Sequence, residues 1–523
     1  MMHEFRKRLT RVACGLAIAT LAAAAASAQT NPPKVLRIGA QATDIGTLDP
    51  HRTSATHEKG PISWIFGGLV RFSPGSADPA RIEGDLAESW SQSSDGKVWI
   101  FKLRRGVQFH RGYGEATADD VVYSLTRAAD PKRSSFSSSF AQMQKIEAVD
   151  AHTVRITLSQ PVPSLLGLVS DYHGGMIVSR KADQELGERF KLSPVGFGPF
   201  EFVEHKTQAQ VTLKAHSAYY RGAPKIDQIV YRFIRSDSSR DLAFNAGELD
   251  LISGRRDQRW VERARQIQGA TVDVFDPGEF RTVFLNQRIK PLDDRRVREA
   301  VARAIDVAQL RQFIGPDVTA PARSSVPPGY LGEVDMQPRY THDLARVKAL
   351  LAEAGHAQGL SLRAVVSNVT SIQPPMEVIQ AQLKKAGINL VMEVVDHTTF
   401  HAQIRKDISA LVFYGAARFP VADSYLTEFY HSRSEIGAPT QVTNFSHCRV
   451  ADAEIDAARS EPDPARQLAL WRTAQEKIHA DICGVPLFDL KQVWLRRNTL
   501  DYGLKLEGAM NLAPPITEKA FLK

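Results

Sequence analysis

The sequence predicts an α/β protein, because strands and helices alternate along its C-terminal half. Residues 360–366 and 388–394 show the period-two pattern of apolar side chains that is typical of strands, and an amphipathic helix is expected between them at 376–386. A second amphipathic helix is expected at 342–355, where Gly355 ends it. Helices that alternate with strands in this way favour a parallel or mixed sheet covered by helices.

The first 28 residues have the features of a secretory signal peptide. Basic residues at positions 6, 7, 8 and 11 precede an apolar run over 12–26, and small residues at 26–28 provide a cleavage site before Gln29. The apolar run is shorter than the roughly 20 residues of a membrane-spanning helix, and no other stretch of the sequence qualifies. We therefore expect residues 1–28 to be removed, and the mature chain to be periplasmic, without stable membrane insertion.

Composition describes an ordinary globular protein of several domains. Hydrophobic residues make up 43% and charged residues 24% of the chain, and its 28 prolines are spread along the sequence. The formal net charge of +8 is modest, and no run of Lys and Arg alternates with aromatic residues, so a nucleic-acid partner is not expected.

Two cysteines remain once the signal peptide, which contains Cys14, is removed. Cys448 and Cys483 can pair in an oxidising compartment, or both can be buried thiols. The sequence leaves these alternatives open, because pairing depends on the geometry of the fold.

The N-terminal half is expected to consist mainly of strands joined by glycine-rich turns. Residues 99–104 alternate apolar and polar side chains, and glycines follow at 106, 112 and 114. Thr117 then predicts the capped start of a helix, with Asp119 and Asp120 in its first turn. Further strands are expected within 34–40, 146–158, 211–215 and 229–234.

The last third of the chain is expected to open with a strand at 282–286, followed by a helix that Asp293 or Asp294 caps. Apolar residues recur every three to four positions along this helix, and its three arginines are expected to point outward: Arg295, Arg296 and Arg298. A long helix at 463–480 precedes an apolar segment at 484–488.

The common signals of enzymes and cofactor sites are absent. The chain has no GxSxG, HExxH or CxxC motif and no phosphate-binding glycine loop, so neither catalytic residues nor a cofactor are expected. The acidic pairs at 119–120 and 293–294 are explained by helix capping. His397 and His401 stand four residues apart, a spacing that places two imidazoles on one helix face, but no third metal ligand stands close in sequence.

Four segments closely resemble the extracytoplasmic solute-binding proteins of dipeptide and oligopeptide importers, solute-binding protein family 5. They are residues 99–124, 196–200, 219–227 and 293–306, in the order of the family. The resemblance implies a periplasmic binding protein-like α/β fold, in which two α/β lobes close on a solute at a hinge and a smaller third lobe abuts the first. It places lobe I at 29–65, 193–277 and 490–523, the small lobe at 66–192, and lobe II at 278–489.

The resemblance also implies where the solute binds, and there the chain departs from the family. Peptide receptors hold the ligand's amino group with a carboxylate in a Gly-Asp pair after a late strand. The matching strand is 410–414, and Ala416 follows Gly415 in place of the acid. Asp423 can replace that acid only if the loop is rearranged.

The anchor for the ligand's carboxylate is missing as well. Dipeptide receptors place a basic residue in the loop that corresponds to 367–371, and this loop, which contains Asn368, carries no charge. Arg418 is the new feature, because it can pair bidentately with a carboxylate or phosphate. A surface position or an intramolecular ion pair is the alternative for Arg418. Nearby aromatic residues can pack on the solute or belong to the core: Tyr414, Phe419 and Tyr425.

The resemblance therefore predicts a monomeric receptor that delivers a peptide or peptide-like solute to the membrane permease subunits of an ABC importer. The alternatives are a non-peptide solute, such as an acidic amino-acid derivative, an opine or a metal or haem chelate, and, from another class, a secreted hydrolase. The candidate ligand-binding residues are Gly415, Ala416, Arg418, Asp423, Asn368 and Tyr414.

Overall fold

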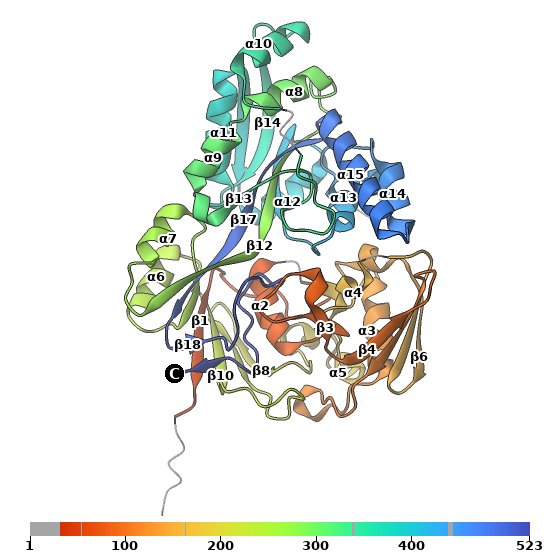
Figure 1. Cartoon of the computed structure of the whole chain (residues 1–523). Coiled ribbons are helices and arrows are strands. Elements are labelled where there is room, and N and C mark those ends of the chain that lie inside the picture. Colours follow the sequence, from red (N-terminus) through yellow and green to blue (C-terminus); the bar gives the residue numbers. More distant parts are fainter. Residues whose placement is uncertain (1–31, 54, 163, 337–339, 438–442) are drawn as a thin grey trace, which may run out of the picture. The chain divides into compact units, whose positions relative to one another are not determined.

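The computed structural model describes residues 32–53, 55–162, 164–336, 340–437 and 443–523. The predicted signal peptide lies outside the described residues. Residues 35–523 form one compact unit of mixed α/β structure (Figure 1). Within the described ranges, no helix is both long enough and apolar enough to cross a membrane.

The largest sheet is mixed. Among the described residues it has nine strands, in the order β16 (Leu411–Ala416), β12 (Ala270–Leu285), β17 (Gly484–Arg497), β11 (Leu251–Ser253), β1 (Val35–Ala40), β10 (Gln228–Phe233), β9 (Gln210–Ala215) and β8 (Phe200–Lys206), with β13 (Thr319–Pro321) beside β17. Strand β1 pairs in parallel with β10 and β11, and the other neighbours are antiparallel. The expectation of a parallel or mixed sheet is thus confirmed as a mixed one.

Smaller sheets complete the strand structure. The antiparallel order β4 (Ala87–Gln92), β5 (Val98–Leu103), β7 (Thr153–Leu158) and β6 (Met143–Asp150) contains the strand expected at 99–104. Strands β14 (Leu360–Ser367) and β15 (Ile388–Val395) pair in parallel, with α11 (Gln373–Lys385) between them in sequence, as the alternation of helix and strand predicts. Two short pairs are β2 (Val70–Phe72) with β3 (Ile82–Gly84) and β18 (Leu500–Asp501) with β19 (Phe521–Leu522).

The remaining helices lie around these sheets (Figure 1). Their bounds are α2 (Thr56–Ile65), α3 (Ala118–Ala129), α4 (Leu165–Leu168), α5 (Arg180–Leu186), α6 (Asp237–Asn245), α7 (Gln258–Ala264), α8 (Arg295–Ala304), α9 (Val307–Ile314), α10 (Leu344–Glu353), α12 (His397–Gln403), α13 (Ala422–Tyr430), α14 (Asp452–Ser460) and α15 (Pro464–Asp481).

Helix caps account for one member of each acidic pair, Asp120 and Asp294. The Asp120 carboxylate accepts a hydrogen bond from the Thr117 backbone N–H at 3.0 Å, in front of α3. Asp294 caps α8 by accepting from the Arg296 N–H at 2.8 Å. Both carboxylates therefore have structural partners.

Arg298 corrects one expectation about α8. Its side chain is only 3% exposed, and the guanidinium donates to the Leu292 carbonyl at 2.9 Å and to the Asp481 carboxylate at 2.9 Å. The prediction that Arg298 points outward is wrong because the end of α15 covers this face of α8 and supplies acceptors for the charge.

Strands β12 and β17 pair over most of their length, and the pairing shifts register twice, between Phe275 and Glu279 and between Arg281 and Thr282. The first shift is the longer interruption. Pro277, which has no N–H to donate, lies in this break. The strand expected at 282–286 is therefore only the end of β12, which begins at Ala270. Sequence periodicity missed the first part because the Asp-Pro-Gly segment at 276–278 interrupts it.

Two large hydrophobic clusters form most of the core of the described residues, and a small third one consists of Phe72, Tyr172 and Met510. One draws mainly on residues between 36 and 233 together with 494–520, and the other on residues between 244 and 495. Strand β12 contributes Phe275 to the first and Phe280 to the second, and β17 contributes Trp494 and Leu495 in the same way. The predicted lobe boundaries stay a prediction, but both clusters share these two strands.

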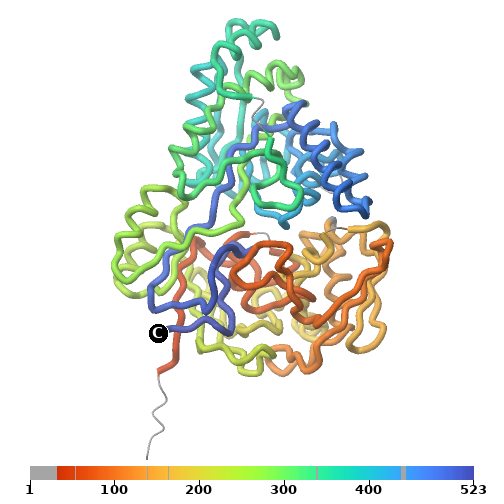
Figure 2. Tube along the Cα trace, viewed as in Figure 1, coloured from red at the N-terminus to blue at the C-terminus, as the bar shows by residue number. Residues whose placement is uncertain are grey.

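The C-terminal segment returns to the N-terminal part of the chain, where its blue trace runs beside orange and red segments in Figure 2. The Gly75 carbonyl accepts from the backbone N–H groups of Glu507 and Gly508, each at 2.8 Å. Backbone hydrogen bonds thus hold the chain end to a loop more than 400 residues earlier in sequence.

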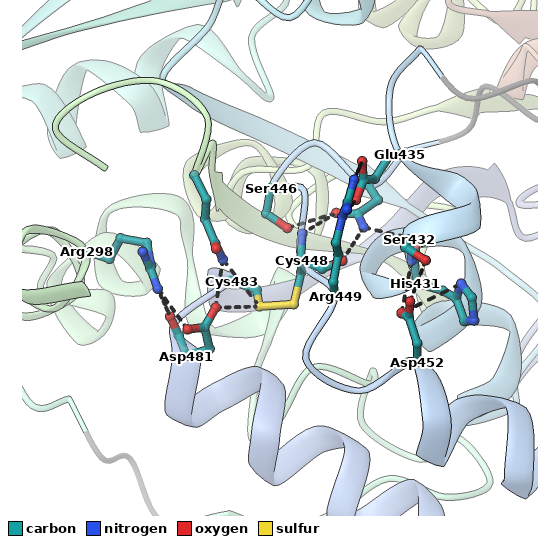
Figure 3. Close-up of a disulfide and its surroundings, with 12 residues drawn as sticks. Arg298, His431, Ser432, Glu435, Ser446, Cys448, Arg449, Asp452, Asp481 and Cys483 are labelled. Atoms are coloured by element: carbon teal, nitrogen blue, oxygen red, sulfur yellow. Dashed lines mark hydrogen bonds and ion pairs between the residues drawn. A yellow bond between two sulfur atoms is a disulfide. The ribbon is translucent and has the colours of Figure 1, made fainter. Parts of the chain in front are cut away.

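Cys448 and Cys483 form a disulfide, with Cα atoms 5.6 Å apart (Figure 3). Both side chains are fully buried. The structure thus resolves the alternative that the sequence left open, and the bond joins the segment before α14 to the residue that precedes β17.

We predict that replacing both cysteines by serine lowers the free energy of unfolding by about 3–4 kcal/mol, because the disulfide closes a loop of some 35 residues. Denaturant unfolding of the oxidised wild type and the double variant measures the difference. Equal midpoints for the two proteins would contradict the prediction.

Candidate functional site

The predicted site residues Tyr414, Gly415 and Ala416 form the end of β16, and there Gly415 lies opposite Arg281 of β12. A Cβ atom on Gly415 would lie 2.4 Å from the Arg281 Nη1 atom, so a larger residue would collide with the guanidinium. Glycine at 415 therefore provides the space that the Arg281 side chain occupies.

Arg418 follows this strand and makes an intramolecular ion pair. Its Nε donates to Glu428 of α13, its Nη1 donates to the Ala417 carbonyl at 3.0 Å, and its guanidinium lies 5.6 Å from the centre of the Phe429 ring. Burial opposes the charge, but Glu428 raises the pKa of Arg418 above its usual value. Within the described residues, the Nη2 group makes no hydrogen bond, so it is available to an additional acceptor.

Asp423 lies in the first turn of α13. Its carboxylate is buried and accepts from Arg459 of α14 at 3.1 Å. The structure therefore does not bring Asp423 together with Arg418, and it gives the carboxylate a partner of its own.

Asn368 lies at the end of β14 and is exposed. Its backbone N–H donates to the Val395 carbonyl at 2.9 Å. Across the described ranges, no hydrogen bond joins Asn368 to residues 414–418. The six predicted residues thus divide into one group at the end of β16 and two separate positions.

Tyr414 lines a small cavity between β12, β16 and α13. The cavity has a volume of about 10 Å³, and aromatic residues dominate its lining: Phe280, Thr282, Phe284, Tyr414, Tyr425, Phe429 and Tyr430. Such a volume holds about one water molecule. These aromatic side chains pack between strands β12 and β16 and helix α13.

A larger cavity of about 80 Å³ lies in another part of the chain, between the segments around Trp64, Phe72, Asp171 and Met510. Ligand pockets for solutes the size of a drug typically measure about 300–1,000 Å³. This cavity therefore has room for a few water molecules and not for a peptide.

His397 and His401 form a pair on α12, with their Nε2 atoms 3.2 Å apart. The Ser367 hydroxyl lies 2.9 Å from the His397 Nδ1 atom, and burial, with His397 and Arg405, lowers the pKa of His401 to about 4. The grouping of potential metal ligands found in the described part of the chain lies elsewhere, at Cys448, Asp481 and Cys483. The His pair thus gains no third protein ligand, and the two cysteines of that other group are joined to each other.

Charged residues that the sequence interpretation missed gather near the register break of β12. Glu279 accepts from both Arg256, at 3.2 Å, and Arg281. These two arginines hold the pKa of Glu279 at about 2 although its burial acts in the opposite direction. Lys59 of α2 is close enough to Glu279 and Arg418 for both charges to influence its pKa. Neither Lys59 nor Arg281 stands out in the sequence, because Lys59 follows the polar residues 56–58 and Arg281 directly precedes the strand expected at 282–286.

The segment 417–419 contacts residues of the predicted small lobe. The Phe419 ring lies 5.7 Å from that of Phe72, and the Tyr172 hydroxyl donates to the Ala417 carbonyl at 3.4 Å. A Cβ atom on Gly167 of α4 would lie 2.0 Å from the Phe419 ring, so the ring packs directly against the glycine backbone.

We predict that Gly167→Ala destabilises the wild-type protein, because the added methyl group collides with the Phe419 ring. In a Phe419→Ala background the same substitution should be neutral or stabilise by up to about 1 kcal/mol, since alanine favours a helix over glycine. A double-mutant cycle on the free energy of unfolding measures this change of sign. Additive effects would show that the two residues are not in contact.

Comparison with known proteins places this geometry among solute-binding proteins. Residues 81–436 match the family described as bacterial extracellular solute-binding proteins, family 5 Middle. Di/tripeptide-binding protein 4 of Pseudomonas aeruginosa (strain UCBPP-PA14) is 30% identical, over 96% of this chain and 96% of that protein. Glutathione-binding protein GsiB of Escherichia coli (strain K12) is 28% identical, over 91% and 92%.

A solved structure is more similar in sequence than these relatives. It is the PBP/SBP MoaA from A. tumefacien R10 in complex with mannopinic acid, which is 47% identical, with a TM-score of 0.89 over 94% of this chain and 100% of that one. The likeness extends over nearly the entire length of both chains, so it includes all the segments described above.

Proposed function

The chain belongs to the bacterial extracellular solute-binding proteins of family 5, and we propose that its solute is an acidic amino-acid derivative of the opine class. The chain is a solute-binding receptor of an ABC importer, and its relatives are binding proteins rather than enzymes. What requires a proposal is the chemistry of the solute.

The observation that carries this proposal is the end of β16. Residue 416, where peptide receptors are expected to have an acid, is alanine, and Asp423 is engaged by Arg459. The nearby side chain that still offers hydrogen bonds is basic, since the Nη2 group of Arg418 has no partner among the described residues. A site without the anchor for an amino group, and with an arginine Nη2 group that has no partner among the described residues, favours a carboxylate over the N-terminus of a peptide.

The 47% identity to a protein solved with mannopinic acid supports the same solute class. The relatives named for di- and tripeptides are about 30% identical, and a peptide solute is the competing possibility. We further propose that residues 1–28 are removed and that the mature protein is a periplasmic monomer, which releases its solute unchanged. The hinge between its lobes is proposed to lie at residues 276–278, where the pairing of β12 with β17 is interrupted.

The proposal is tested by thermal unfolding of the purified protein with mannopinic acid and, separately, with a mixture of di- and tripeptides. We expect mannopinic acid to raise the melting temperature and to be recovered intact and in stoichiometric amount, with no effect of the peptides. Stabilisation by peptides alone would overturn the solute class, and turnover of either solute would overturn the receptor role.

We predict that Arg418→Ala weakens the binding of mannopinic acid at least about tenfold, which corresponds to loss of one charge-assisted hydrogen bond. The melting temperature without solute should change little, because Glu428 is partly exposed and can be hydrated. Isothermal titration measures the affinity. Arg449→Ala is the matched control, since Arg449 also pairs with a glutamate, Glu435, but its side chain is 61% exposed. Equal affinities of Arg418→Ala and wild type would remove Arg418 from the site.

A further inference from the structure

Lys59 is a buried cation without an acceptor. It lies in α2, its residue is only 7% exposed, and its ammonium group lies 5.4 Å from the centre of the Tyr172 ring. Within the described residues, it makes neither a hydrogen bond nor an ion pair with a carboxylate. Burial and the charge of Arg418 lower the pKa of Lys59 to about 8, and Glu279 opposes them. A lysine seldom occupies such a position unless an anion joins it.

The two arginines that pair with Glu279, whose charge also acts on Lys59, are incompletely paired as well. Arg256 and Arg281 share one carboxylate, that of Glu279. The Nη1 atom of Arg256 and the Nε atom of Arg281 are buried and have no hydrogen-bond partner among the described residues, and Arg281 is only 3% exposed. A buried donor without an acceptor lowers the stability of the folded protein. One glutamate therefore does not satisfy this group.

The charges in this region do not balance. Four cations, Lys59, Arg256, Arg281 and Arg418, lie near two carboxylates, those of Glu279 and Glu428. Asp489, next to Glu279, adds only part of a charge, because burial and Asp276 raise its pKa to about 7. It also accepts from the Gly278 N–H at 3.0 Å. The excess of buried positive charge is what a ligand with one or two carboxylates would neutralise.

We infer that Lys59 and Arg281 form a binding site for a carboxylate group of the solute, with Glu279 and Arg256 positioning the Arg281 guanidinium. The inference rests on the proposed acidic solute and assigns one of its charges to a place in the fold. Lys59 comes from α2, whose apolar residues belong to the first hydrophobic cluster, and Arg281 follows Phe280 of β12, which belongs to the second. Solute binding would then connect the two parts of the core.

The test is Lys59→Met, which keeps the length of the side chain and removes its charge. Without solute, we expect the melting temperature of this variant to equal or exceed that of the wild type, because an unpaired buried charge is lost. With mannopinic acid as the probe, we expect its dissociation constant to rise about 10- to 100-fold. The control is Lys145→Met, whose lysine is 65% exposed and pairs with Glu147, and it should leave the affinity unchanged.

The possible outcomes separate this inference from the proposed function. If mannopinic acid stabilises the wild type and Lys59→Met equally, the carboxylate site is wrong while the solute class stands. If mannopinic acid does not bind the wild type at all, the proposed function fails first. Should Lys59→Met fail to fold, the wild type is titrated with mannopinic acid in which the carboxylates are converted to amides. Equal affinity for acid and amide would overturn the inference, and loss of binding would support it.

Discussion

The pairing of β12 with β17 is the constraint on which the rest of the structure depends. These strands are hydrogen bonded from Ala270 with Arg497 to Phe284 with Gly484, and residues of both strands enter both hydrophobic clusters. The longer interruption, between Phe275 and Glu279, separates two stretches of ladder, and the second of them shifts register again between Arg281 and Thr282. A change of angle at this point would disturb few hydrogen bonds, because the ladders on either side would remain intact.

The location of the charged cluster follows from this constraint. Glu279 stands at the first residue after the interruption, and Arg281 two residues later, so their side chains project where the strands diverge from regular pairing. Buried ions are tolerated there only when they are mutually paired, and the pairing of Arg256 and Arg281 with one glutamate is incomplete. Pairing that remains incomplete within the chain is consistent with a protein that obtains the missing partner from solution.

The sequence predicted the fold better than the site. Helices and strands with regular periodicity, such as β14, α11 and β15, were predicted to within a few residues because their burial depends on local pattern. The first part of β12 was missed because proline and glycine interrupt the alternation, and Arg298 was misplaced because acceptors from α15, distant in sequence, bury it. Lys59 and Arg281 were missed for a similar reason. Their significance lies in incomplete pairing among the described residues, which becomes evident only when both α2 and β12 are in place.

The disulfide also bears on how the protein would respond to proteolysis. Residues 448–483 form a covalently closed loop that contains both α14 and α15, and the connection between these helices at 461–463 is mostly exposed. Cleavage in this connection would leave the two fragments joined through Cys448 and Cys483. A nicked molecule would migrate as one chain until a reductant separated it, and the fragment that begins with α15 would keep β17 attached to the molecule.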